Sequence, residues 1–205
     1  MKTIVLTTQK GGCGKSTLAA CLAVAAQAEG ERVSLLDLDP KHSLSRWASR
    51  RGDTSLVARG VSRAKLPQTL RQLAERNESL AIIDTPMLES PATIAAIEVG
   101  DLSLIPARPA AFDVWASEVT SRKLRLIGKN FFFIINQVPH TLTGRVQDSI
   151  LALGSSGPVL RPFVRERPAF AEVGRSGRGV TEISPRGGAA REIVDLWRNI
   201  KRELD

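Results

Sequence analysis

The sequence predicts an α/β fold, a three-layer sandwich in which helices cover both faces of a mostly parallel, twisted sheet. Short apolar, β-rich runs alternate with helical stretches along the 205 residues of the chain. The runs are continuously apolar, as is typical of parallel strands buried on both faces. No repeat, low-complexity tract or linker interrupts the pattern, so residues 1–205 are expected to form a single domain.

The individual elements follow from these runs. Strands are expected over residues 3–8, 33–39, 80–86, 102–107, 131–137 and 157–162. Helices are expected over residues 14–30, 66–77, 90–100, 111–128 and 187–205, and the first ends at Gly30, a residue type that often caps helices. Right-handed crossovers would join the parallel strands. The Gly- and Arg-rich residues 161–187 are expected to be loop-like.

The composition is typical of a soluble globular protein, with 42% apolar and 24% charged residues. No apolar run reaches the roughly 18 residues of a membrane span. The first residues lack the pattern of a signal peptide, so a cytoplasmic location is expected. Cys13 and Cys21 form neither a metal-binding nor a disulfide pattern and are expected to be small filling residues.

The net charge of +8 and the pI near 10.2 favour a polyanionic partner, either nucleic acid or an anionic membrane surface. The positive charge is concentrated, because residues 41–76 hold nine basic residues and two acidic ones. The alternative is a solvated basic face that serves only solubility.

The stretch TTQKGGCGKST, residues 7–17, lies between the first expected strand and the first expected helix. Its glycines let backbone N–H groups turn toward phosphate oxygens, and the helix N-terminus adds the positive end of its dipole. Lys15 is placed to neutralise β- and γ-phosphates, and Ser16 to ligate Mg²⁺. The stretch departs from the general phosphate-binding pattern twice, with Gln9 in place of a glycine and Lys10 as an additional lysine.

This variant, K-G-G-x-G-K-[ST], resembles the deviant Walker A motif of the ParA/MinD family of ATPases, whose signature lysine matches Lys10. Five further segments resemble family motifs in the same order: LLDLDP (35–40), AIIDTP (81–86), LIPARPAAFDVWA (104–116), FIINQV (133–138) and RPAFAEVGRSGRGVTE (167–182). The resemblance covers nearly the whole chain and is strongest to the short, ParF-like ParA branch, which lacks an N-terminal helix-turn-helix extension. It implies a P-loop NTPase fold with ATP and Mg²⁺ as cofactors.

Three carboxylates follow expected strands and should meet at one edge of the sheet, where ligand sites of α/β proteins form. Asp84 would hold Mg²⁺ through water. Asp37 and Asp39, two residues apart at a strand end, are expected to point the same way, one toward the water shell of the metal and one toward the attacking water. The residues alone leave the two roles open, and any single strand-end Asp is also a candidate loop cap. The resemblance favours Asp39 for hydrolysis and Asp37 beside Mg²⁺.

The resemblance implies the remaining nucleotide contacts. The phosphate cradle would consist of Gly11, Gly12, Cys13, Gly14, Lys15, Ser16 and Thr17. Asn136 would meet the adenine edge, and Pro106 would flank the base or simply form a turn. Lys10 would reach the phosphates of a second subunit across a nucleotide-sandwiched dimer, so catalysis would depend on Lys10, Lys15 and Asp39. Lys41 stands where the family commonly has glutamine, a change that would alter hydrolysis or dimer contacts.

By the same resemblance, the chain is expected to be a ParA-like ATPase of the cytoplasm, associated with the nucleoid. Its ATP-dependent homodimer would bind DNA without sequence preference, and a ParB-like or other adaptor protein would stimulate its weak hydrolysis. The cargo would be a plasmid, a chromosome or a protein cluster. The candidate DNA contacts lie in the C-terminal quarter: Arg161, Arg165, Arg167, Arg175, Arg178 and Arg198.

Two alternatives remain at this point. In a MinD-like membrane switch, residues 188–204 would bind lipid through Ile193, Trp197, Ile200 and Leu204, although such a stripe more often faces a core. A metabolic enzyme on the same scaffold is the third possibility. The sequence offers it neither cluster-binding cysteines nor a recognisable second substrate site.

Overall fold

The computed structural model describes residues 1–52 and 54–204, and its strands form one parallel sheet. The strands are β1 (Lys2–Thr8), β2 (Val33–Asp37), β3 (Ala58–Gly60), β4 (Leu80–Met87), β5 (Leu102–Ala107), β6 (Phe131–Ile135) and β7 (Val159–Leu160). Across the sheet they follow the order β3-β2-β4-β1-β5-β6-β7, and each neighbouring pair is parallel. The prediction of a parallel sheet from continuous apolar runs is confirmed.

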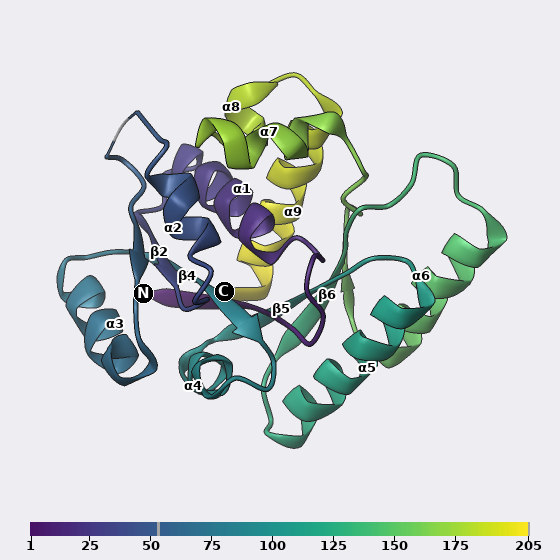
Figure 1. The fold of residues 1–205 in the computed structure, drawn as a ribbon, viewed down its shortest axis with the longest axis horizontal. Helices are drawn as coiled ribbons and strands as arrows, with labels where there is room; N and C mark the ends of the chain where they lie inside the picture. The colour runs from purple at the N-terminus through teal and green to yellow at the C-terminus, as the bar shows by residue number, and fades with distance from the viewer. Residues whose placement is uncertain (53, 205) are drawn as a thin grey trace.

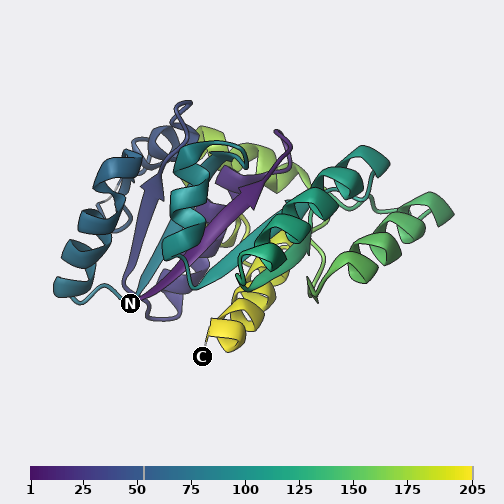
Figure 2. The same ribbon diagram turned by 90° about the horizontal axis from the view of Figure 1, so that it is seen from below.

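Helices cover both faces of this sheet (Figures 1 and 2). One layer contains α1 (Lys15–Ala28), α2 (Ser43–Ala48), α7 (Pro168–Ser176), α8 (Val180–Ile183) and α9 (Gly188–Leu204). The opposite layer contains α3 (Leu66–Glu75), α4 (Pro91–Val99), α5 (Ala111–Leu126) and α6 (Gly144–Ser156), with a short 3₁₀ helix, η1 (Arg63–Lys65), before α3. The predicted three-layer α/β sandwich is therefore confirmed.

Successive residues of a strand serve different layers of this sandwich. On β1, Ile4 and Leu6 belong to the core beneath α1, together with Leu22 of that helix. Val5, between them, belongs to the opposite core, together with Leu73 of α3. Because side chains of a strand alternate between the two faces and both faces are covered, the strand needs apolar residues at every position.

The structure contains elements that the sequence pattern did not predict: the edge strand β3 and the helices α2, α6, α7 and α8. The expectation that residues 161–187 are loop-like is wrong, because α7 and α8 lie within them. Val173 and Val180 from these helices are buried in the core beneath α1. Gly179 allows α8 to approach α1 closely, since a Cβ there would lie 2.9 Å from Val24.

The apolar face of α9 is buried in the protein. Its stripe of Ile193, Trp197, Ile200 and Leu204 belongs to the core beneath α1. The face that the membrane alternative would require thus already has a partner. Within residues 1–52 and 54–204, no helix has both the length and the apolar character that a bilayer crossing requires.

We expect Trp197→Ala to lower the free energy of unfolding by about 3–5 kcal/mol, because it leaves a cavity in this core. Trp197→Phe retains most of the volume and should cost much less. Urea unfolding followed by circular dichroism measures both changes. Equal stability of Trp197→Ala and the unsubstituted chain would show that α9 does not belong to the core.

Candidate nucleotide-binding site

The loop between β1 and α1 has the backbone geometry of an anion cradle. Gly12 and Gly14 adopt φ values of 78° and 94°, a region that L-residues with side chains rarely occupy. The helix begins at Lys15, and no side chain caps its N-terminus. The first N–H groups of α1 therefore lack partners within the helix and are available to a bound anion.

The end of β6 holds this loop in place. The Asn136 Nδ2 donates a hydrogen bond of 2.8 Å to the Cys13 carbonyl, and the Gln137 Nε2 donates one of 3.1 Å to the Gly12 carbonyl. A Cβ at Gly14 would lie 2.4 Å from the Asn136 Nδ2, so the contact also requires glycine. The Asn136 amide was predicted to meet the adenine edge. Its nitrogen is already used in the hydrogen bond to the loop.

A cavity of about 640 Å³ opens at the loop and gathers many of the predicted residues. Asp39 and Lys41 line it from the segment after β2, and Met87 lines it from the end of β4. Lys41, which stands where the motif that this segment resembles commonly has glutamine, therefore lines the same cavity as Lys15. The other lining residues are Gly11, Gly12, Gly14, Ser16, Thr17, Pro40, Ser43, Pro86 and Gln137.

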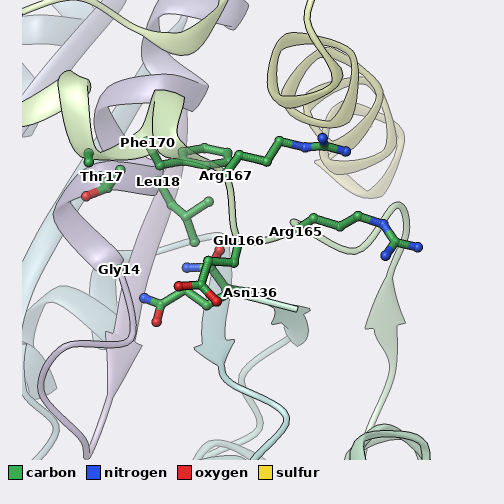
Figure 3. A pocket seen from close by; sticks show the side chains of 10 residues that line it. Gly14, Thr17, Leu18, Asn136, Arg165, Glu166, Arg167 and Phe170 are labelled. Carbon is green, nitrogen blue, oxygen red and sulfur yellow. The ribbon is translucent and has the colours of Figure 1, made fainter. Parts of the chain in front are cut away.

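A second cavity of about 270 Å³ adjoins the first, since Gly14, Thr17 and Gln137 line both. Figure 3 shows its lining by Asn136, Glu166 and Phe170. Two adjoining cavities at one phosphate loop suit an elongated ligand with an anionic end, such as a nucleotide. The sequence pattern did not indicate Glu166 or Phe170 as site residues, although Phe170 lies in the segment RPAFAEVGRSGRGVTE and Glu166 directly precedes it.

Three of the predicted site residues, Pro106, Arg165 and Arg167, do not line the phosphate cavity. Pro106, predicted to flank the base or to form a turn, is buried within β5 opposite Ile134 and lines neither cavity. Arg165 and Arg167, expected at DNA, border the second cavity, with guanidinium groups that point away from it (Figure 3). The Arg167 guanidinium is paired with Glu192 of α9 at 2.6 Å.

Asp84 lies at the base of the loop. Its Oδ2 accepts a hydrogen bond of 2.5 Å from the Ser16 hydroxyl, while its buried Oδ1 has no partner among the described residues. Burial raises the pKa of Asp84 to about 7, the Ser16 hydrogen bond opposes this shift, and the neighbouring Asp37 adds to it. A buried carboxylate with a free oxygen is suited to a cation.

Asp37 and Asp39, which were expected to point the same way, have different surroundings. Asp37 ends β2, and its Oδ2 accepts hydrogen bonds from the Ser45 N–H and hydroxyl at 2.8 and 2.9 Å. Its Oδ1 accepts a third from the Asp39 N–H at 3.1 Å. Asp39 lies beyond the strand, where the alternation of side chains no longer applies, and lines the phosphate cavity.

The donor set fits Mg²⁺ bound together with phosphate. Among the described residues, no group of three or more acidic, histidine or cysteine side chains could hold a metal ion by itself. Mg²⁺ commonly keeps several waters and binds through one or two carboxylates and the phosphates of the substrate. Ser16 and Asp84 fit such a set, and Asp37 lies opposite Asp84 in the sheet register.

Lys10 does not line the phosphate cavity of its own subunit. Its Nζ lies 2.6 Å from the Asp113 Oδ2 on α5 and 5.7 Å from the centre of the Phe112 ring. Arg108 binds both oxygens of the same carboxylate, at 2.8 and 3.1 Å. Burial alone would raise the pKa of Asp113, but the hydrogen bonds from Arg108 and Lys10 outweigh it and the pKa is lowered.

This fold and loop define a nucleotide-binding protein of the P-loop type. Residues 4–180 match the family described as the CobQ/CobB/MinD/ParA nucleotide binding domain. The chain is 32% identical to Maintenance of carboxysome distribution protein A of Gloeobacter kilaueensis, over 96% of this chain and 90% of that protein. It is 30% identical to Protein ParA of Rhizobium radiobacter, over 95% of this chain and 92% of the relative.

Among solved structures, the ATP complex of a Cyanothece McdA variant superposes with a TM-score of 0.81 at 17% identity, covering 100% of this chain and 96% of the other. The chain belongs to the CobQ/CobB/MinD/ParA nucleotide-binding domain family. It is an ATPase of the ParA/MinD type, and its relatives include positioning proteins.

Asp84 makes the stability of the nucleotide-free protein dependent on pH. Because its folded pKa is raised, the native state retains this proton between about pH 4 and pH 7, and stability is lost as the pH rises through that window. Asp84→Asn removes the titration, so its advantage over the unsubstituted chain should grow to about 3–4 kcal/mol at pH 8.

Thermal unfolding from pH 5 to pH 8, in EDTA and without nucleotide, tests this expectation. Groups distant from Asp84 titrate equally in both proteins and cancel in the difference. A pH-independent difference between the two proteins would contradict the raised pKa.

Proposed function

We propose that this chain is a positioning ATPase that binds ATP with Mg²⁺, dimerises around the nucleotide and binds DNA without sequence preference. A partner protein stimulates its weak hydrolysis and so releases it from DNA. The cargo is a plasmid, a chromosome or a protein cluster, and the similarity to a protein named for carboxysome distribution supports a role in positioning. The observation that carries the proposal is the placement of the two lysines of the loop.

The two lysines serve different subunits. Lys15 lines the phosphate cavity, whereas Lys10 lies outside it, with its side chain 34% exposed and its ammonium group paired with Asp113. In the ATP-bound dimer, Lys10 exchanges this carboxylate for the phosphates of the second subunit. Arg108 remains on both oxygens of Asp113, so the exchange leaves no buried carboxylate unpaired.

The surface around Lys10 supports a dimer contact. Phe112 and Trp115 of α5 are 70% and 59% exposed, and their rings meet edge to face with centroids 5.3 Å apart. Met87, which lines the phosphate cavity, is also exposed. Large apolar side chains next to a charged site are typical of a surface that another protein covers.

Different residues of the site bind the phosphates, bind the metal and orient the attacking water. Bound Mg²⁺ would neutralise charge on the β- and γ-phosphates. Lys15 and the N–H groups at the start of α1 hold the phosphates, while Ser16 and Asp84 hold the metal. Asp39, which lines the cavity from a segment outside the sheet, orients the attacking water. Lys41, two residues along the same segment, donates its backbone N–H to Asp39 at 2.9 Å and so fixes that carboxylate.

Lys10→Ala should bind ATP but lose ATP-dependent dimerisation and hydrolysis, because its cation acts on the second subunit. Lys15→Ala should instead weaken nucleotide binding itself. Titration calorimetry measures binding, and light scattering after gel filtration measures the dimer. Normal dimerisation and hydrolysis by Lys10→Ala would refute this account of the loop.

Dimerisation should also change the fluorescence of Trp115. The other two tryptophans, Trp47 and Trp197, are 3% and 1% exposed, so Trp115 is the one whose surroundings a partner changes. We expect ATP to shift the tryptophan emission to shorter wavelength, and both Lys10→Ala and Trp115→Phe to abolish the shift. An ATP-induced shift that persists in Trp115→Phe would place the change elsewhere.

A further inference from the structure

Five cations form an exposed basic surface on β3, η1 and α3: Arg59, Arg63, Lys65, Arg71 and Arg76. We call it the β3–α3 surface. Across the described residues, none of the five has a carboxylate within 4 Å. Residues 54–76 include one acidic residue, Glu75. The surface therefore carries a nearly uncompensated positive charge.

The fold places these cations together at one end of the sheet. Arg59 lies opposite Leu36 in the sheet register, so it shares the sheet face on which Leu66 and Leu73 of α3 are buried. Because β3 is the outermost strand, no other strand or helix of the described residues covers this edge of the sheet outside α3 (Figure 1). The surface is open to a large partner.

Half of the arginines predicted to bind DNA lack this free charge. Residues 161–205 hold ten basic and seven acidic residues, against five and one in residues 54–76. Three of the six candidates are already in ion pairs, Arg167 with Glu192, Arg175 with Glu172 and Arg198 with Glu29. A phosphate would have to compete with these carboxylates, whereas on the β3–α3 surface it would not.

The chemistry of the surface favours nucleic acid over lipid. Among the large hydrophobic side chains of residues 54–76, only Val57 is exposed, so the surface has little to insert into a bilayer. The ten residues of α3 span about 15 Å, and duplex DNA carries one charge per roughly 1.7 Å of its axis. A face of this length meets several phosphates at once.

We propose that the β3–α3 surface, rather than the arginines of the C-terminal quarter, contacts the phosphate backbone of DNA. The inference rests on the proposed DNA-binding function and assigns its location. Five cations per subunit bind weakly alone, whereas a dimer that places both copies on one duplex binds far more tightly through their effective concentration. In that geometry, ATP-dependent dimerisation controls DNA affinity without any change in the surface itself.

Two variants with equal loss of charge test the assignment. One carries Arg63→Gln, Lys65→Gln and Arg71→Gln, and the matched control carries Arg161→Gln, Arg175→Gln and Arg198→Gln. Binding of a fluorescent random-sequence DNA duplex is measured with ATP and Mg²⁺ across a salt series. We expect the first variant to bind at least about tenfold more weakly, with a salt slope smaller by about 2.7 per subunit, and the control to bind almost normally.

Circular dichroism and the ATP-induced Trp115 shift confirm that both variants fold and dimerise. If the first variant binds DNA normally, or only the control loses binding, the assignment is overturned while the proposed function stands. If the unsubstituted dimer fails to bind DNA, the proposed function itself fails. Binding instead to vesicles of phosphatidylglycerol and phosphatidylcholine, lost in the first variant, would identify a lipid-binding surface and overturn the assignment.

Discussion

The hydrogen bond from Asn136 to the Cys13 carbonyl fixes the phosphate loop to the end of β6, and the geometry of the site depends on it. With the loop held there, α1 begins where Ser16 can reach Asp84 on β4, and Lys10 can reach Asp113 on α5. The contact is possible because position 14 has no side chain and a positive φ. One glycine and one amide thus determine how elements from three separate parts of the chain meet.

Three buried carboxylates surround this loop, and each is compensated differently. Two cations pair with Asp113, and backbone and hydroxyl donors satisfy Asp37. Asp84 receives one hydroxyl among the described residues and retains an unpartnered oxygen. In a medium of low dielectric, the least compensated carboxylate has the greatest affinity for an added cation. The electrostatics thus favour the metal at Asp84 over the other two carboxylates.

The sequence predicted the elements whose signal is local. Continuous apolar runs indicated the central strands, and the glycine-rich loop indicated the phosphate site. The edge strand β3 has only three residues, and α8 has four, so neither is long enough to repeat its pattern of apolar residues twice. Asp37 and Asp39 look equivalent in sequence because their difference arises where β2 ends. Phe170 and Glu166 reach the second cavity through tertiary packing, which no spacing along the chain encodes.

Arg108 also has a consequence for the speed and reversibility of the switch. A lysine that leaves a singly paired buried carboxylate must first pass through a state with an isolated charge, which is slow and costly. Here Asp113 would retain both hydrogen bonds from Arg108 while Lys10 moves from Asp113 to the phosphates of the second subunit in the proposed dimer. In the proposed dimer, the barrier to releasing Lys10 from Asp113 would be correspondingly low, so this ion pair would not limit how fast Lys10 reaches the second nucleotide.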